Sequence, residues 1–230
     1  MQQVSIRRGG EQRNATRRGR MEVLSVDLPK RLSSSSSWSQ QEIALKIQQT
    51  HKLTIHMQDG SQQLLTDYVS SESAQARSLE AFHQGKPFGD PSFNPAIQSF
   101  EGLPRPPIST QAWLDLSDAE RLQQNATVFS NFPEFLTLVR RQQANLNPQA
   151  VELLRQLDSA SAQCFGLVSN LQSIMASLGI APGPAMPTKL PATGSAFLMK
   201  LTGYSICRLY QGWTNCCQKA MALLVTKYPV

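Results

Sequence analysis

Residues 151–179 read VELLRQLDSASAQCFGLVSNLQSIMASLG, and their spacing predicts one helix of a bundle. Apolar or small side chains recur at alternating intervals of three and four residues, at Leu154, Leu157, Ser161, Cys164, Val168, Leu171, Met175 and Leu178. This heptad pattern is typical of a seam that packs against neighbouring helices. Gly179 follows the last member and is expected to end the helix.

A second helical pattern lies upstream, from Ser39 to about residue 75. Ser39 is a good N-cap residue, and Glu42 at the third helical position completes a capping box in the sequence. Asp59-Gly60 interrupts the apolar repeat, and a glycine costs roughly 1 kcal/mol against alanine inside a helix. We therefore expect a local kink or a frayed turn at this dipeptide.

Two more helices complete the predicted set. One follows Ser109 and runs to about Asn145, with Pro133 inside it as an expected kink. At Asn147-Pro148 this helix is expected to end and the next one to begin, with Asn147 as the expected N-cap of the next helix. The last helix spans about residues 196–227.

The lengths of the connections predict how the four helices are arranged. Residues 81–108 and 180–195 are rich in proline and glycine and cannot be helical, whereas the turn at Asn147 is only a few residues long. At about 3.3 Å per residue, each long connection can return along a helix of about 45 Å. The order long, short, long therefore predicts an all-α, long-chain four-helix bundle with up-up-down-down topology. An up-down-up-down bundle with floppy loops stays open as the alternative.

The first long connection also carries phenylalanines, at Phe82, Phe88, Phe93 and Phe100. A solvated loop seldom holds so many large apolar side chains. We therefore expect this connection to pack on the body of the bundle.

The N-terminal segment differs from the rest of the chain. Residues 1–37 lack a hydrophobic period and end in a run of five serines, so we expect a disordered tail, with residues 38–230 forming the bundle. Six arginines in residues 1–20 place much of the net charge of +6 in this tail. No aromatic residue accompanies them, so nucleic-acid binding is not favoured. Met21 is an alternative candidate for the start of translation.

The motifs of common enzymes are missing from the sequence. It has no HExxH, GxSxG, P-loop or GxGxxG pattern, and neither its histidines nor its cysteines have metal-ligand spacing. His51 is expected to be a partly buried histidine at the edge of the core, and the four cysteines are expected to be free, buried thiols. We therefore expect no enzyme, no cofactor and no metal.

The sequence also bears on membranes and glycans. Apolar residues make up 40% of the chain, but no stretch of about 20 of them could cross a membrane, and the first 30 residues lack the apolar core of a signal peptide. Asn14 and Asn125 each begin an N-x-S/T sequon. Both are interpreted as chance matches, since without a signal peptide neither need meet the glycosylation machinery.

Several segments together resemble the cardiotrophin branch of the interleukin-6 type cytokines. They are IQQTH at 47–51 with LLTDYV at 64–69, PFGDPSFNP at 87–95, RRQQANLNP at 140–148, and FLMK at 197–200 with CRLYQGW at 207–213. The matches cover residues 40–215 in order and with compatible spacing. The tail of residues 1–37 matches nothing that we recognise.

The resemblance implies an extracellular cytokine or growth factor without catalytic activity. Members of the family bridge the leukaemia inhibitory factor receptor and the shared glycoprotein-130 receptor, which activates Janus kinases and STAT factors. The first receptor is contacted by a Phe-x-x-Lys motif at the start of the last helix, here Phe197 and Lys200. Residues three apart share a helix face, so an aromatic anchor with a lysine beside it suits this role. The alternative is that Phe197 only packs on the preceding loop.

The shared receptor meets the exposed faces of the first and third helices in this family. Candidates by position are Gln48, Lys52, Arg155 and Asp158. The resemblance is compatible with secretion without a classical signal peptide, with the protein cytoplasmic before release, and leaves the need for a third, non-signalling receptor open. We expect a monomer, without nucleic-acid binding or membrane insertion. An intracellular helical adaptor whose proline-rich connection binds a partner remains the alternative.

Overall fold

The computed structural model describes residues 39–76, 98–192 and 194–230. The expected disordered tail, together with Phe82, Phe88 and Phe93, lies outside these residues. The described residues form helices and no extended strand. The helices are α1 (Gln40–Ala76), α3 (Thr110–Leu114), α4 (Asp118–Leu146), α5 (Val151–Ser177) and α6 (Ala196–Lys227).

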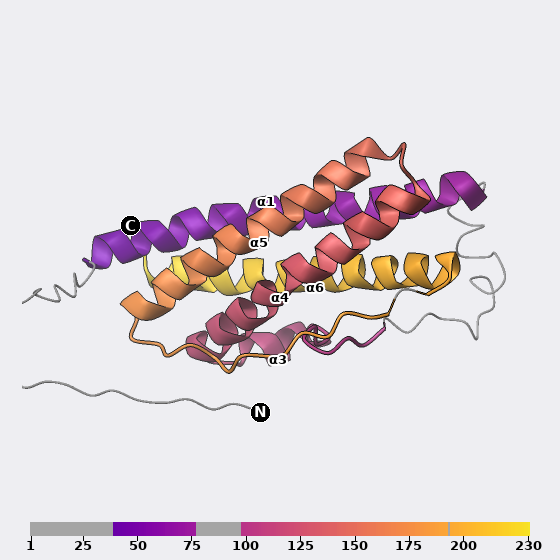
Figure 1. Cartoon of the computed structure of the whole chain (residues 1–230). Helices are drawn as coiled ribbons and strands as arrows, with labels where there is room; N and C mark the ends of the chain where they lie inside the picture. The colour runs from indigo at the N-terminus through magenta and orange to yellow at the C-terminus, as the bar shows by residue number, and fades with distance from the viewer. Residues whose placement is uncertain (1–38, 77–97, 193) are drawn as a thin grey trace, which may run out of the picture. The chain divides into compact units, whose positions relative to one another are not determined.

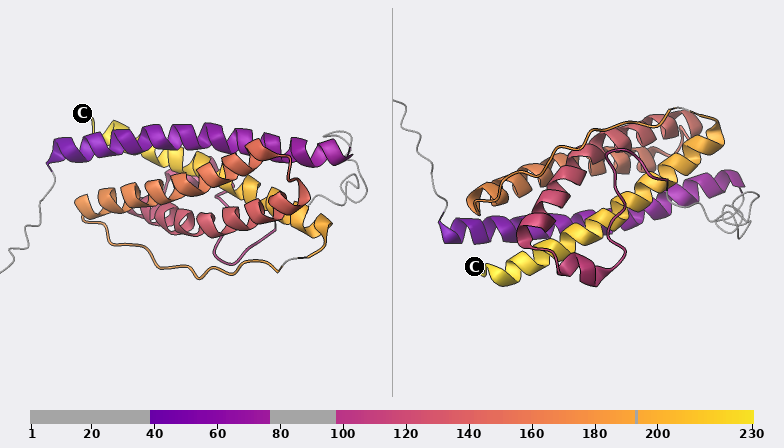
Figure 2. Two further views of the ribbon diagram at one scale, coloured as in Figure 1. Left: turned by 45° about the horizontal axis from the view of Figure 1, so that its top comes forward. Right: turned by 90° about the horizontal axis from the view of Figure 1, so that it is seen from below.

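The four long helices form a bundle with the predicted topology. The main packed pairs are α4 with α5, α1 with α6, α1 with α5, and α4 with α6. In Figure 1, α1 and α4 run in one direction along the bundle, and α5 and α6 run in the opposite direction. Each main packed pair is therefore antiparallel, and the order along the chain is up-up-down-down. The connection from α5 to α6 returns along the outside of the bundle, as Figure 2 shows.

The start of α1 forms as predicted, but its expected interruption does not occur. The Ser39 hydroxyl accepts a hydrogen bond from the Glu42 amide (3.2 Å), and the Glu42 carboxylate accepts from the Ser39 amide (2.7 Å). The helix then continues through Asp59 and Gly60 without a break. Met57 and Leu64, one turn on either side, are both buried in the core. Their packing stabilises the helix across the glycine.

The predicted second helix is divided into α3 and α4, which the sequence analysis did not anticipate. Ser117 caps α4 with a full capping box to Glu120. The buried Arg121 donates hydrogen bonds to the carbonyls of Leu114 (2.7 Å) and Leu116, and its ion pair with Asp118 is 2.7 Å long. The guanidinium therefore satisfies the carbonyl groups that the end of α3 leaves without helical partners.

The junction between α4 and α5 corrects a second expectation. Asn147 is the C-cap of α4 and not the N-cap of the next helix. Helix α5 begins at Val151 after Ala150, which makes no side-chain cap. The Asn147 side-chain amide instead donates to Gln143 Oε1 (2.7 Å) on the preceding turn of α4. Gly179 ends α5 as expected, with a φ of 68° that favours glycine.

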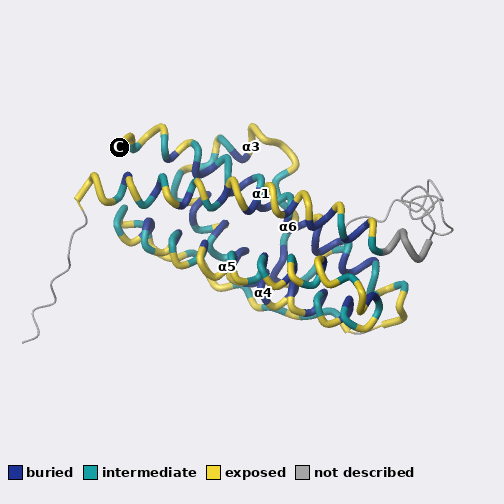
Figure 3. The backbone as a smooth tube through the Cα atoms, turned by 90° about the horizontal axis from the view of Figure 1, so that it is seen from above, coloured by how far each residue is buried: buried dark blue, intermediate teal, exposed yellow. Residues whose placement is uncertain are grey.

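The buried face of α5 is wider than the predicted seam. Half of the predicted members are fully buried and the other half are only partly buried. The buried residues of α5 are Leu153, Leu157, Ala160, Cys164, Leu167, Leu171, Ile174 and Met175. Because α5 packs against both α1 and α4, its apolar face covers an additional row of residues. Figure 3 shows the buried faces of the long helices turned toward one another.

Both connections pack on α4, as expected for the first of them. The Asn131 side-chain amide donates to Gly102 O (2.9 Å) in the first connection and to Met186 O (3.3 Å) in the second. Gly102 has a φ of 91°, and a Cβ there would lie 2.8 Å from Pro187 O. Phe100 packs on Phe135 of α4 with 5.7 Å between ring centroids. The two connections are thus joined through one side chain of the bundle.

All four cysteines are free and buried, as expected: Cys164, Cys207, Cys216 and Cys217. His51 is partly buried at the edge of the core, also as expected. Among the helices of the described ranges, none is long and apolar enough to span a bilayer.

Candidate functional site

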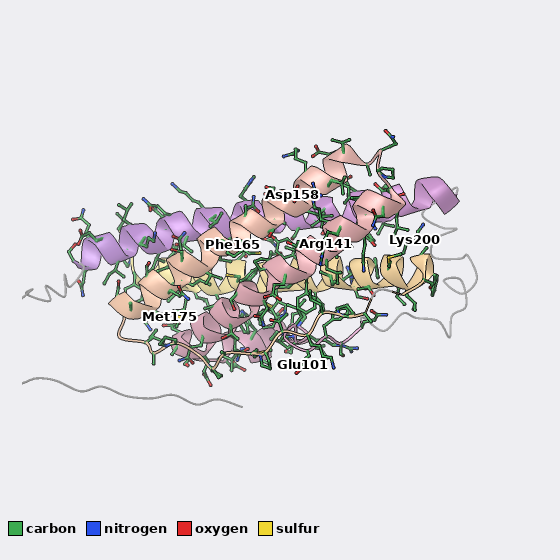
Figure 4. All side chains as sticks on the ribbon, viewed as in Figure 1. Glu101, Arg141, Asp158, Phe165, Met175 and Lys200 are labelled. Atoms are coloured by element: carbon green, nitrogen blue, oxygen red, sulfur yellow. The ribbon has the colours of Figure 1, made fainter. Side chains whose placement is uncertain are left out.

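The first turn of α6 presents the Phe-x-x-Lys motif. Ser195 caps the helix, and its hydroxyl accepts a hydrogen bond from the Leu198 amide (3.3 Å). Phe197 and Lys200 are both partly exposed, and Figure 4 shows Lys200 near the start of the helix. Leu198, between them, is 47% exposed, and the sequence analysis did not include it. This turn therefore offers two accessible apolar side chains beside a lysine.

Tyr68 of α1 holds this turn in place from behind. Its hydroxyl donates a hydrogen bond to Lys200 O (2.9 Å) and accepts one from Gln143 Nε2 of α4 (3.1 Å). Gly203 permits the close approach, because a Cβ there would lie 2.7 Å from Tyr68 Cζ. Three helices thereby fix the backbone that carries Phe197 and Lys200, which reduces the ordering cost of binding a partner.

A second feature is a hollow between α1 and α5, with a volume of about 280 Å³. One wall comes from α1, through His56, Gly60 and Gln63, and the other from α5. No atom lies within 4 Å of the position that a Cβ on Gly60 would take, so the glycine leaves the hollow open. Tyr210 of α6 contributes to the lining, although only 1% of its surface is exposed.

The hollow has a buried polar atom, Gln156 Oε1, that no described residue pairs. The Tyr210 hydroxyl is also buried, and the Cys164 thiol is its neighbour. Burial first, and then the neighbouring Cys164, raises the pKa of Tyr210, so its hydroxyl stays protonated. At the outer end, Arg155 and Glu152 form an exposed ion pair (2.5 Å), and hydrogen bonds from Arg155 and Gln156 lower the pKa of Glu152. The hollow is therefore polar at its rim and can receive side chains from a partner.

Three of the four predicted residues for the shared receptor lie on this face, and the fourth does not. Arg155 lines the hollow directly. Lys52 and Gln48 lie on α1 about one and two helical turns beyond the His56 end. Asp158 pairs with Arg140 of α4 (2.9 Å), on the side of α5 away from α1. The structure thus places three of the four along one face and the fourth toward another helix.

The remaining lining residues were missed by the sequence analysis. His56, Gly60, Gln63, Ser159 and Gln163 meet only because α1 and α5 are antiparallel in this register. The hydrogen bond from Gln156 Nε2 of α5 to Asp67 Oδ2 of α1 (2.6 Å) is formed in that register. Gly60 was the one available signal, since a glycine inside a helix is unfavourable and can have a packing or functional reason.

The Asn125 sequon and the metal-binding residue types of the described part of the chain give no additional site. Asn125 is fully buried, and its side-chain amide nitrogen donates to Arg121 O (2.8 Å), so a glycan cannot be attached in the folded state. Asn14 lies outside the described residues. Within the described part of the chain, no group of three or more His, Cys, Asp or Glu side chains could hold a metal ion.

Comparison with known proteins gives consistent matches. The model of a family described as plethodontid receptivity factor matches residues 22–230. Cardiotrophin-2 of Mus musculus is 34% identical over 184 residues, which cover 79% of this chain and 84% of the relative. Cardiotrophin-1 of the same organism is 37% identical over 178 residues, covering 74% and 80%. Ciliary neurotrophic factor of Mus musculus is 26% identical over 125 residues, covering 53% and 62%.

Proposed function

The chain belongs to the plethodontid receptivity factor family and to the cardiotrophin branch of the interleukin-6 type cytokines, and from this we propose that it bridges two receptors. It acts outside cells as a ligand for the leukaemia inhibitory factor receptor and the shared glycoprotein-130 receptor. Joining the two receptors activates Janus kinases and STAT factors in the target cell. The protein is a signalling ligand and not an enzyme.

The observation that carries the proposal is the first turn of α6. Phe197 and Lys200 stand on one face of a turn that Tyr68 ties to the bundle. An aromatic side chain on a rigid helix is typical of the residues that dominate binding free energy. We assign this turn, with Leu198, to the leukaemia inhibitory factor receptor.

The hollow between α1 and α5 supports a separate contact with the shared receptor. It lies on the faces of the first and third long helices, and its rim carries Arg155. Lys52 and Gln48 extend the same proposed surface, and Asp158, on the α4 side of α5, is a separate candidate contact. Two separate surfaces are what a ligand that joins two receptors requires.

The test uses one variant for each surface. In the first variant, Phe197→Ala and Lys200→Ala remove the side chains of the α6 turn and leave its backbone hydrogen bond to Tyr68 intact. In the second, Gly60→Arg fills the hollow, which has open space at this position. Leu223→Ala, at an exposed position near the other end of α6, is the matched control.

Each variant should lose a different interaction. The first should lose binding to the leukaemia inhibitory factor receptor and keep binding to the shared receptor, and Gly60→Arg should do the reverse. Both should abolish STAT phosphorylation in cells that carry the two receptors, whereas Leu223→Ala should signal like the unmodified chain. No response to the folded, unmodified protein would refute the proposal and favour an intracellular helical adaptor.

A further inference from the structure

A second hollow lies where the two long connections cover the first half of α4. Its volume is about 360 Å³. Pro104 lines it from the first connection and Pro184 from the second, and Figure 1 shows both connections running along the α4 side of the bundle. Val128 of α4 and Trp213 of α6 also line it, although only 2% of each is exposed, so they form its floor. The hollow shares no lining residue with the one between α1 and α5.

The walls of this hollow are tied to α4 and to each other. Gln123 Nε2 of α4 donates a hydrogen bond to Ala181 O (2.8 Å) in the second connection. Lys189 N donates to Glu101 O (3.3 Å), which joins the second connection to the first, and the Asn131 side chain bonds to both. Prolines in both connections also restrict the backbone. The hollow is therefore formed before a ligand arrives, which keeps the ordering cost of binding low.

The floor offers an aromatic ring whose polar group is already paired. Trp213 Nε1 donates a hydrogen bond to Pro104 O (2.8 Å), and the Trp213 ring packs edge-on against Trp113 with 5.9 Å between ring centroids. The ring is thus held in one orientation, and it has no other donor. Aromatic side chains favour contact with other flat aromatic rings. A volume of about 360 Å³ is near the lower limit of about 300 Å³ for small-molecule sites, so the ligand must be compact.

The rim of the hollow adds a fixed negative charge. Glu120 of α4 lines the hollow, and its Oε2 accepts hydrogen bonds from the Ser117 amide (2.8 Å) and the Ser117 hydroxyl (2.7 Å). These bonds lower the pKa of the Glu120 carboxyl group, which is therefore ionised at neutral pH. Because both bonds use Oε2, Oε1 remains available to a ligand. Arg105 also lines the hollow, but it is exposed on an irregular segment, so its charge is less well positioned than that of Glu120.

We propose that this hollow binds a compact aromatic amine. The ring of the ligand lies against Trp213 and Val128, and its protonated amine donates a hydrogen bond to Glu120 Oε1. Glu120, Gln124 and Val128 all line the hollow and follow one another on α4 at intervals of about 6 Å, so a chain of about two atoms joins ring and amine. A charge-assisted hydrogen bond to a fixed carboxylate favours an amine over a neutral or acidic aromatic compound. The bound ligand contacts both connections and α6, so it stabilises the folded chain.

Isothermal titration calorimetry of the full chain with three probes tests the proposal. Tryptamine, a two-ring amine, should bind with a Kd on the order of 100 µM, as expected for a ligand of its size. Indole lacks the amine and should bind about fivefold more weakly, and indole-3-acetate, with a carboxylate in place of the amine, should bind more weakly still. Saturating tryptamine should also raise the Tm of the chain in thermal unfolding.

Variants in the middle and at the rim of the hollow locate the site. Gln124→Trp fills the hollow from an exposed position and should abolish tryptamine binding, whereas Asn145→Trp, at an exposed position elsewhere on α4, is the matched control and should change nothing. Glu120→Gln removes the charge but keeps a side chain that completes a capping box, so the fold is retained. It should weaken tryptamine binding about fivefold and leave indole binding unchanged. Arg105→Gln should not weaken tryptamine binding, because it removes a charge of the same sign as the amine.

Three outcomes would overturn the proposal, provided that circular dichroism shows each variant to be helical. The first is the absence of tryptamine binding to the folded, unmodified chain. The second is binding that persists in Gln124→Trp, which would place the ligand elsewhere. The third is tighter binding of indole-3-acetate than of tryptamine, or an equal affinity of Glu120→Gln and the unmodified chain for tryptamine, because either result would refute the assigned class of ligand.

Discussion

Helix α6 makes two seams of different chemistry, one with α1 and one with α4. Toward α1 the contacts include polar pairs: Ser61 meets Thr214 (2.8 Å), and Gln58 donates to Asn215 (3.3 Å). Toward α4 they are aromatic, with Tyr210 packed edge-on against Phe132 at 5.2 Å between ring centroids. Burial of apolar surface supplies most of the folding free energy, whereas a buried hydrogen bond contributes about 1 kcal/mol.

The two seams of α6 have different roles: one mainly stabilises the fold, and the other aligns α1 with α6. The aromatic seam buries the large side chains of Phe129, Phe132 and Tyr210, and we expect their burial to contribute more favourable free energy than the polar pairs do. The polar seam specifies which residues of α1 stand opposite which residues of α6. That alignment in turn positions the first turn of α6 through Tyr68. The following substitutions test whether the two roles are distinct.

The largest effect is expected at Phe132, in the aromatic seam. It is fully buried and touches the rings of both Phe129 (5.5 Å) and Tyr210 (5.2 Å). Phe132→Ala should lower the free energy of unfolding by about 3–5 kcal/mol, because it removes apolar contacts and leaves a cavity. Urea unfolding followed by circular dichroism measures the change. A loss below about 1 kcal/mol would show that the seam is not the main source of stability.

A smaller effect is expected where α1 and α6 approach most closely. In Gly203→Ala the new methyl group overlaps with the ring of Tyr68 and must displace it. We expect a loss of about 1–3 kcal/mol in the free energy of unfolding. Binding to the leukaemia inhibitory factor receptor should weaken as well, because the first turn of α6 loses its support. Gly166→Ala, with no atom near the added Cβ, is the matched control and should not destabilise the fold. Unchanged receptor binding would contradict the role of Tyr68.

The polar pair itself should contribute less. Ser61→Ala should cost about 0.5–1.5 kcal/mol, since the Thr214 hydroxyl keeps its hydrogen bond to Gln211 O (2.9 Å). Adding Thr214→Val should cost little more, because its contact with Ser61 is already lost and only its local hydrogen bond to Gln211 O is removed. A double-mutant cycle from urea unfolding gives the coupling between the two hydroxyls. A cost of 3 kcal/mol or more for Ser61→Ala would place this seam on a level with the aromatic one.

The smallest effect concerns pH and the end of the polar seam. Burial lowers the pKa of His51 below the ordinary value of about 6.5 for histidine, and its ring Nε2 lies 3.3 Å from Gln218 Nε2. The contribution of this neutral histidine is present above pH 6.5 and is lost as the pH falls through the lower folded pKa. Thermal unfolding between pH 7 and pH 5 should therefore show a smaller fall in Tm for His51→Gln than for the unmodified chain. An equal fall in both would exclude His51 as the cause.

The topology was predictable because it depends on quantities that the sequence carries directly. The breaker-rich connections and the short turn at Asn147 restrict which helices can be parallel. The division of the second helix was missed, although the Ser117–Glu120 capping box is visible in the sequence. What stabilises the break is Arg121, whose carbonyl partners come together only in the folded chain.

The site was predictable in part for the same reason. The Phe-x-x-Lys motif is local, so its two residues share a helix face in any helical conformation. The hollow between α1 and α5 is not local, since its walls are about a hundred residues apart in the sequence. Only the register of the two helices brings Gly60 opposite Ser159. For the same reason, no sequence pattern could show that Asp158 pairs with Arg140.

The buried cysteines have a consequence for the chemistry of the protein in oxidising surroundings. Burial raises the pKa of the Cys207 thiol to about 12, so the reactive thiolate is scarce at neutral pH while the bundle stays folded. External disulfides therefore react with this thiol mainly when the bundle opens. The rate of its labelling reports how often the core is exposed, and a cytokine without disulfides can persist in an oxidising medium for as long as it stays folded.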